Sequence, residues 1–202
     1  MKNILKKNYL VLLVLSISLL LTINVSALDL ARQGFIDQLA EEGFVEGENL
    51  SIDLQNAQAD FSTAQTIAQR FGQNNPDLVL AIATPSAQTA AKVINNSPVL
   101  ITAVTDPVEA GIVENMEEPG GNITGTTDMN PVAKQLELIK EFLPEVQKIG
   151  VLYNSGEVNS VVQVKIAKKK AEKMGVELKE ATVSNSSEVS LAASSLVDTV
   201  DA

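Results

Sequence analysis

Short runs of consecutive apolar residues, each followed by a helical pattern, constrain the fold of this chain most strongly. "LVLAIA" (78–83), "PVLITAV" (98–104) and "KIGVLYN" (148–154) are apolar through most of their length. Strands that are buried on both faces of a parallel sheet have this pattern, whereas strands with one solvated face alternate. The runs therefore predict buried parallel strands.

Helical patterns fill the stretches between these runs. Helices are expected near 28–42, 62–75, 85–94, 131–144, 159–174 and 187–200, with a short helical segment near 108–116 and further strands at 49–57, 122–127 and 176–183. Strand and helix alternate throughout, which predicts a doubly wound α/β architecture with parallel sheets. Ligands of such folds lie beyond the carboxyl ends of the strands, so the loops that leave those ends are the places to look for function.

The composition excludes several kinds of chemistry. The 202 residues are 45% hydrophobic, which supports a globular core, and the formal net charge of −10 argues against a nucleic-acid partner. The chain contains no Cys and no His, so it lacks a thiolate nucleophile, the commonest metal ligand and the usual general base near neutral pH. It also lacks a phosphate-binding or dinucleotide-binding glycine motif. We therefore expect no catalytic residue, no metal site and no cofactor.

The N-terminus has the three-part design of a secretory signal peptide. Three lysines lie within the first seven residues, an apolar run extends over 9–23, and Val25-Ser26-Ala27 is a small-x-small cleavage pattern. We expect a signal peptide over 1–27 that is removed after Ala27, and hence an exported protein. The alternative is a signal anchor that stays uncut, because the apolar run is long for a signal peptide.

Three strand-to-helix junctions share one sequence pattern. Each places a side-chain oxygen at a candidate N-cap and a proline at the first helical position: Thr84-Pro85, Asp106-Pro107 and Asn130-Pro131. A helix N-terminus offers free N–H groups and partial positive charge, which suit a carboxylate. Capping alone is the alternative at any single junction, but three of them together favour a ligand cradle.

Ser86 raises the possibility of a nucleophile on a sharp strand-to-helix turn. The nucleophile elbow needs glycines around its serine, whereas Ser86 stands between Pro85 and Ala87, and no histidine is present to activate it. The turn is therefore expected to hold a ligand rather than to cleave one. A hydrolytic enzyme on the same α/β scaffold remains the alternative from another class.

Several segments resemble a known family. "LARQGFIDQLAEEGFVEGENL", "DLVLAIATPSAQTAA", "PVLITAVTDPVEAGIV", "PGGNITGTTDM" and "KQLELIKEFLPEVQKIGVLYNSGEVNSVVQVK" are similar, in this order, to the ABC-transporter substrate-binding proteins of the tryptophan/tyrosine-type uptake family. The resemblance runs from Leu28 to Ala202. It implies a type I periplasmic-binding-protein fold, with a first α/β lobe over 28–130 and a second over 131–202, which close on a small ligand.

The resemblance also implies a ligand site. Residues of the first lobe, of the crossing between the lobes and of the second lobe would line the cleft: Thr84, Ser86, Thr105, Asp106, Thr126, Thr127, Asp128, Tyr153, Asn154, Glu157, Asn159 and Ser160. The implied ligand is an amino acid or similar small solute, which is aromatic in several members of the family. The implied partners are the permease subunits of an ABC importer at the outer face of the cytoplasmic membrane. A ligand-sensing domain tethered by an uncut anchor is a further alternative.

The chain departs from the family pattern at both ends. Relatives carry a first strand just before the helix that here begins near Leu28, whereas in this chain the signal-like segment runs straight into that helix. Relatives also continue beyond Ala202. We therefore expect the first strand of the first lobe to be missing and the second lobe to be incomplete.

Overall fold

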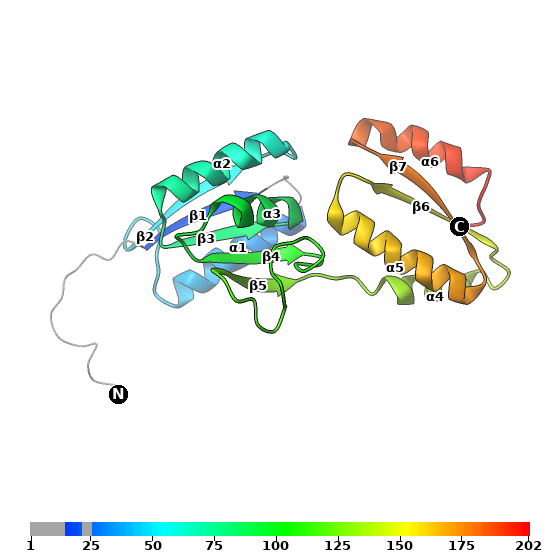
Figure 1. The fold of residues 1–202 in the computed structure, drawn as a ribbon, viewed down its shortest axis with the longest axis horizontal. Helices are drawn as coiled ribbons and strands as arrows, with labels where there is room; N and C mark the ends of the chain where they lie inside the picture. The colour runs from blue at the N-terminus through cyan, green and yellow to red at the C-terminus, as the bar shows by residue number, and fades with distance from the viewer. Residues whose placement is uncertain (1–14, 22–25) are drawn as a thin grey trace.

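The computed structural model describes residues 15–21 and 26–202, and its strands form two parallel sheets (Figure 1). The first sheet has the strand order β2-β1-β3-β4-β5 and the second pairs β6 with β7. The strands are β1 (Leu15–Leu21), β2 (Leu50–Asn56), β3 (Leu78–Ile82), β4 (Val99–Val104), β5 (Ile123–Thr127), β6 (Lys148–Asn154) and β7 (Glu177–Val183). The predicted doubly wound α/β architecture with parallel sheets is confirmed.

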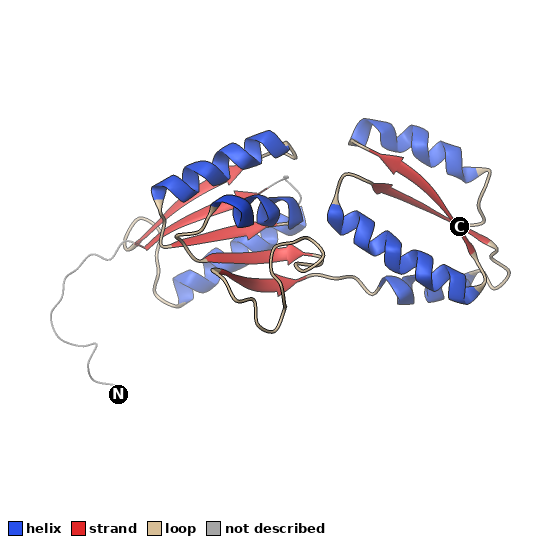
Figure 2. Ribbon diagram, viewed as in Figure 1, coloured by secondary structure: helices blue, strands red, loops and turns tan. Residues whose placement is uncertain are grey.

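Helices lie on both faces of each sheet (Figure 2). They are α1 (Ser26–Glu41), α2 (Phe61–Asn74), α3 (Thr84–Val93), α4 (Val132–Phe142), α5 (Val158–Met174) and α6 (Val189–Val197), with a short 3-10 turn at Ser186–Glu188. The two sheets lie on either side of Asn130 in the sequence. The boundary between lobes at 130/131 remains a prediction.

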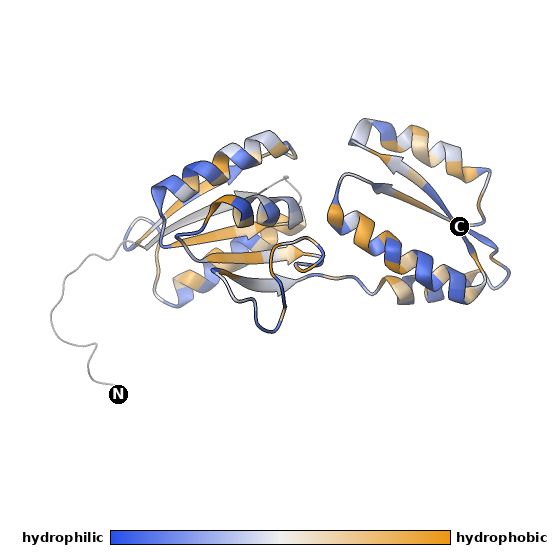
Figure 3. Ribbon diagram, viewed as in Figure 1, coloured by the Kyte–Doolittle hydropathy of each residue, from blue (hydrophilic) through white to orange (hydrophobic). Residues whose placement is uncertain are grey.

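Side chains of β3 show why this strand is apolar along its whole length. Val79 and Ala81 are fully buried in the cluster that α2 and α3 cover. Leu80 and Ile82 are buried on the opposite face, against Phe35 of α1. Successive side chains of a strand point to opposite faces, so a strand with helices on both sides must be apolar at every position. Figure 3 shows this hydrophobic centre of the first sheet.

The second sheet packs in the same manner on a smaller scale. Leu136 of α4 and Ala167 and Ala171 of α5 bury one face of it, together with Ile149 of β6. The opposite face lies against α6, close enough that a Cβ on Gly150 would stand 3.4 Å from Leu196. The second lobe therefore has its own core.

The expectation that the first strand is missing is wrong. β1 lies at the centre of the first sheet, where Ile17 is paired in parallel with Ile52 of β2 and with Leu78 of β3. The apolar run that suggests a signal peptide is also the pattern of a strand between two neighbours, and periodicity alone does not separate the two. The rest of the predicted signal peptide, at 1–14 and 22–25, lies outside the described residues.

Asp60 is the N-cap of α2, since its Oδ1 accepts a hydrogen bond of 2.6 Å from the Thr63 N–H. Two local predictions also need correction. The helical segment expected near 108–116 is a series of turns. α4 begins at Val132 with Pro131 rather than Asn130 at its N-cap. Gly111, in the middle of the 108–116 stretch, has a φ of 67°, which an α-helix does not contain.

Candidate functional site

A cavity of about 260 Å³ lies where the carboxyl ends of the strands of both lobes meet. Loops after β2, β3, β4, β5 and β6 all contribute to it, together with the first turn of α1. The lining residues are Leu28, Ala59, Asp60, Phe61, Ala83, Thr84, Pro85, Ala103, Thr105, Asp128, Glu157 and Asn159. This is the place at which doubly wound folds bind their ligands.

The wall from the first lobe is built around the start of α3. Thr84 is 3% exposed, and its Oγ1 accepts a hydrogen bond of 3.4 Å from the backbone N–H of Thr105. Thr84, predicted as the N-cap of α3, is instead the first residue of this helix. The N-cap is Ala83, whose side chain has no oxygen that could accept a hydrogen bond from the first N–H groups. The uncapped N-terminus of α3 therefore faces the cavity with its partial positive charge.

Three alanines of the cavity wall have left-handed backbone conformations. The φ angles are 64° at Ala59, 76° at Ala83 and 54° at Ala103. Such a conformation costs a non-glycine residue of the order of 1 kcal/mol or more and persists only where the surrounding structure imposes it. Their clustering at one cavity indicates backbone segments that the fold holds in a fixed shape before any ligand arrives.

The opposite wall, from the second lobe, is acidic and rich in amides. The Glu157 carboxylate accepts a hydrogen bond of 3.1 Å from Asn154 Nδ2 and one of 3.4 Å from Asn159 Nδ2. Asn159 Oδ1 is buried and has no hydrogen-bond partner within the described part of the chain. Asp128 adds a second carboxylate, on the segment that follows β5. This wall can accept hydrogen bonds from a cation.

Asp60 and Phe61 belong to the cavity although sequence reasoning missed them. Hydrogen bonds to Asp60 from the Ser62 side chain and then from Thr63 lower its pKa to about 2, so it is ionised at neutral pH. Phe61, next along the chain, is 53% exposed and lines the cavity, and Lys92 Nζ lies 5.6 Å from the centroid of its ring. The loop follows a strand end just as the predicted site loops do, so the same rule would have found it.

Four predicted residues of the first lobe and the crossing do not line the cavity. Asp106 caps the turn after β4, accepting hydrogen bonds from the Val108 and Glu109 N–H groups. Thr126 Oγ1 donates to Thr102 Oγ1 at 3.1 Å, and Thr127 Oγ1 donates to the Thr105 carbonyl at 2.7 Å. The threonine hydroxyls thus tie β5 to β4.

Ser86, the fourth of these residues, is fully buried within the first turn of α3. Its Oγ has no hydrogen-bond partner within the described residues, and it does not line the cavity. A nucleophile must be exposed to its substrate and hydrogen-bonded to a base. The position of Ser86 therefore gives no support to a hydrolytic reading of this turn.

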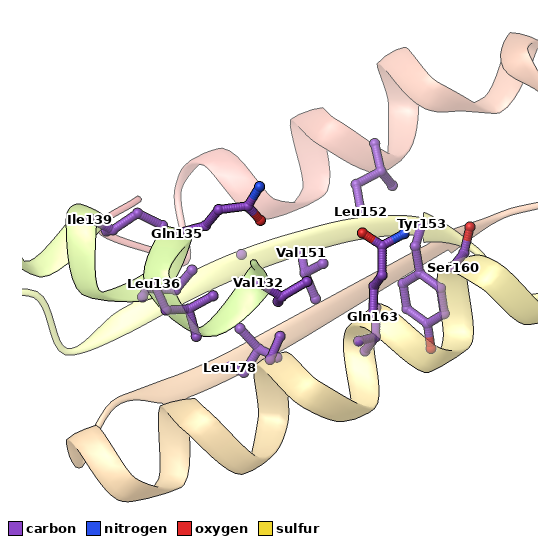
Figure 4. Close-up of a pocket in the computed structure, with 14 residues that line it drawn as sticks. Val132, Gln135, Leu136, Ile139, Val151, Leu152, Tyr153, Ser160, Gln163 and Leu178 are labelled. Atoms are coloured by element: carbon purple, nitrogen blue, oxygen red, sulfur yellow. The ribbon is translucent and has the colours of Figure 1, made fainter. Parts of the chain in front are cut away.

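The remaining predicted residues of the second lobe lie elsewhere. Tyr153 and Ser160 line a separate apolar groove between α4, β6 and α5, together with Leu136 and Leu178 (Figure 4). Asn154 lies beside the cavity rather than in its wall, where it holds Glu157. A helix turns by about 100° per residue, so Ser160 faces away from Asn159 despite being its neighbour.

Tyr153 has a structural partner on the second lobe. Its hydroxyl donates a hydrogen bond of 2.8 Å to Glu180, and the other oxygen of Glu180 lies 2.7 Å from Lys168 Nζ. The Lys168 and Tyr153 hydrogen bonds lower the pKa of Glu180, and the Glu180 carboxylate raises the pKa of Tyr153 and of Lys168. The three groups link β6, β7 and α5.

Direct contacts join the two lobes beside the cavity. The Nζ atom of Lys165 in α5 lies 3.4 Å from Oε2 of Glu109 in the first lobe. Asn130 Nδ2 donates a hydrogen bond of 3.3 Å to Gln163 Oε1. Val158, at the start of α5, packs against the core of the first lobe. Among the described residues, no group of three or more acidic side chains could hold a metal ion, and no helix is long and apolar enough to cross a membrane.

Two α/β lobes with a pre-shaped cavity at their strand ends define the class of two-lobed solute-binding proteins. The family model described as "ABC transporter substrate binding protein" matches residues 16–202. The chain belongs to this family. The match begins twelve residues before Leu28, within the segment that forms β1.

Known relatives agree with this assignment. The chain is 49% identical to the tyrosine-binding protein of Clostridioides difficile (strain R20291) over 175 residues, which cover 87% of this chain and 51% of the relative. It is 38% identical, with a TM-score of 0.88, to a Streptococcus pneumonia ABC domain solved in complex with L-Trp, covering 93% of this chain and 63% of that one. It is 47% identical, with a TM-score of 0.68, to the ligand-free, open structure of a Clostridium difficile substrate-binding protein with adhesive properties, covering 93% and 64%. The chain thus spans about half the length of the curated relative.

Proposed function

We propose that this protein is the solute-binding component of an ABC importer and captures an amino acid, of aromatic type, in the cavity between its lobes. The observation that carries the proposal is the cavity itself, to which the strand-end loops of both lobes contribute. A ligand there contacts both lobes at once, so binding energy stabilises their closed arrangement.

The two walls of the cavity suit the two charged groups of an amino acid. The α-carboxylate is proposed to lie at the uncapped N-terminus of α3, beside the Thr84 hydroxyl and the Thr105 backbone. The α-ammonium is proposed to lie between the Asp128 and Glu157 carboxylates. Asn159 Oδ1, buried without a partner in the described chain, offers a further acceptor.

An aromatic side chain suits the remaining surface of the cavity. Phe61 is exposed and lines the cavity, as does Leu28, so an aromatic ring there would remove apolar surface from water and could stack on Phe61. Two of the relatives support this choice, since one is a tyrosine-binding protein and another was solved with L-Trp.

We infer that the two lobes have the closed arrangement of a ligand-bound protein, and a comparison with two relatives supports this. The chain superposes better on the L-Trp complex (TM-score 0.88) than on the ligand-free, open structure (0.68), although it is less identical in sequence to the former. Two proteins of one fold differ in this way when their lobes are rotated relative to each other. The Lys165–Glu109 contact is one of those that would break on opening.

The proposed partners are the permease subunits of the importer, and the proposed location is the outer face of the cytoplasmic membrane. Membership of the substrate-binding family supports both. The work of such a protein is capture, closure and delivery without covalent chemistry, which agrees with a chain that has neither His nor Cys.

The absence of Trp from the chain allows a direct binding assay. Fluorescence of L-tryptophan, excited in the presence of the full chain, is expected to shift and saturate, and L-tyrosine is expected to compete. Glu157→Gln is expected to weaken binding roughly 10- to 100-fold, because it removes a charge-assisted contact to the ammonium. Glu145→Gln, an exposed acid that does not line the cavity, is the matched control. Equal binding by both variants, or no response to any amino acid, would contradict the proposal.

A further inference from the structure

We propose that Leu15–Leu21 stays in the folded protein as the central strand of the first lobe, so that any N-terminal processing ends before Leu15 rather than after Ala27. The inference goes beyond the proposed function, because it concerns which chain folds and not what that chain binds. It rests on the pairing of β1, on the start of α1 and on the extent of the family match.

The pairing shows what removal would do to the sheet. β1 is paired along its whole length, Leu15–Leu21, with β2, and over Ile17–Leu21 with β3. In the strand order β2-β1-β3, the hydrogen bonds of β1 join β2 to the rest of the sheet. Adjacent strands lie about 4.8 Å apart, so without β1 the neighbours would stand about 10 Å apart, too far for hydrogen bonds. The loss would leave two unpaired edges at the centre of a buried parallel sheet.

The start of α1 argues against cleavage after Ala27 for a separate reason. α1 begins at Ser26, so the cut would fall within its first turn. The new N-terminus would be a positively charged amino group at Leu28, at the positive end of the helix dipole, which is unfavourable. Leu28 also packs against the core of this face and lines the cavity, so the charge would be brought to the ligand site.

The family match supports the same boundary independently of the pairing. It covers residues 16–202 and therefore includes all of β1 after Leu15. A signal peptide that ended at Ala27 would remove twelve matched residues. The strand pairing, the start of α1 and the family match therefore all favour a mature chain that retains β1.

The direct test is the N-terminus of the folded protein. The full 202-residue chain, carrying a C-terminal tag, is produced in a bacterium, and the intact mass of the protein is measured in the cytoplasmic and the exported fractions. We expect every cooperatively unfolding species to contain Leu15. A species that begins at Leu28 and unfolds cooperatively would overturn the proposal, whether or not it binds an amino acid.

Two backbone variants in β1 give a second readout. Ser18→Gly is expected to lower the Tm of the purified protein by about 1–4 °C, because glycine weakens a strand interior. Leu19→Pro removes a ladder donor and is expected to abolish cooperative unfolding. Ser184→Gly, at an exposed bend outside the strands, is the matched control. If the segment is absent from the folded protein, both β1 variants will melt with the parent chain, which would refute the proposal even if L-tryptophan binds.

Discussion

Gly125 is the position at which the smallest change should damage the first lobe most. It lies on β5 opposite Ile101 of β4, where the register of the pair begins to shift. A Cβ on Gly125 would stand 2.0 Å from the Ile101 carbonyl oxygen and 2.7 Å from its nitrogen. An ordinary carbon–oxygen contact needs about 3.3 Å, so Gly125→Ala requires β5 to move by about 1.3 Å.

The magnitude follows from what that movement breaks. The obstacle is backbone of a neighbouring strand, which cannot rotate away as a side chain would. Loss of about two ladder hydrogen bonds at about 1 kcal/mol each, with about 1–3 kcal/mol for overpacking, gives about 3–5 kcal/mol of destabilisation. For a chain of this size, the Tm of Gly125→Ala should fall by roughly 6–20 °C.

The assay is thermal unfolding followed by far-UV circular dichroism. Gly34→Ala is the matched control, since Gly34 lies inside α1 with no heavy atom within 4 Å of its ideal Cβ. That change should raise stability by about 0.5–1 kcal/mol. If Gly125→Ala melts within about 2 °C of the parent chain, a shift that corresponds to no more than about 1 kcal/mol, the close approach of β4 and β5 is wrong. Because β5 leads directly to Asp128, ligand affinity should fall together with stability.

Three further changes test the packing and the electrostatics. Phe71→Ala, at a fully buried site in the core of the first lobe, should cost about 3–5 kcal/mol in urea denaturation, and a cost below about 1 kcal/mol would contradict its burial. Glu180→Gln should flatten the pH dependence of the Tm below pH 5: the pKa of Glu180 is lowered in the folded state, so its stabilisation is present above the unfolded pKa and is lost as the pH falls through the folded one. An unchanged pH profile would show that Lys168 and Tyr153 do not hold this carboxylate. Asp60→Ala should lower the Tm whereas Asp60→Asn, which still caps α2, should lower it less; equal effects would argue against the cap.

The sequence predicts the architecture well because the strands are buried on both faces. The run at 78–83 is apolar at every position, and the structure packs its successive side chains against α1 on one face and against α2 and α3 on the other. β1 escaped detection because a central strand of a parallel sheet and a signal peptide both have mostly apolar sequences. Its strand partners, 35 residues away in β2 and 61 residues away in β3, are what distinguish the two.

The candidate site is predicted in part. The strand-end rule places Thr84, Thr105 and Asp128 in the cavity wall, since parallel strands end at one edge of a sheet. It does not say which way each side chain turns, and so Ser86 is assigned to the cavity although it is buried in α3. The backbone of Ala83 could not be predicted either, because tertiary packing, not alanine's own preference, imposes a positive φ.

The claim that both lobes hold one amino acid is tested most directly by a crystal structure of the protein grown with L-tyrosine. The ligand is expected in the cavity between the lobes, with its carboxylate at the start of α3 and its ammonium within hydrogen-bond distance of Asp128 or Glu157. Tyrosine bound elsewhere, such as in the groove that Tyr153 lines, would contradict the proposed site. So would a ligand that contacts one lobe alone.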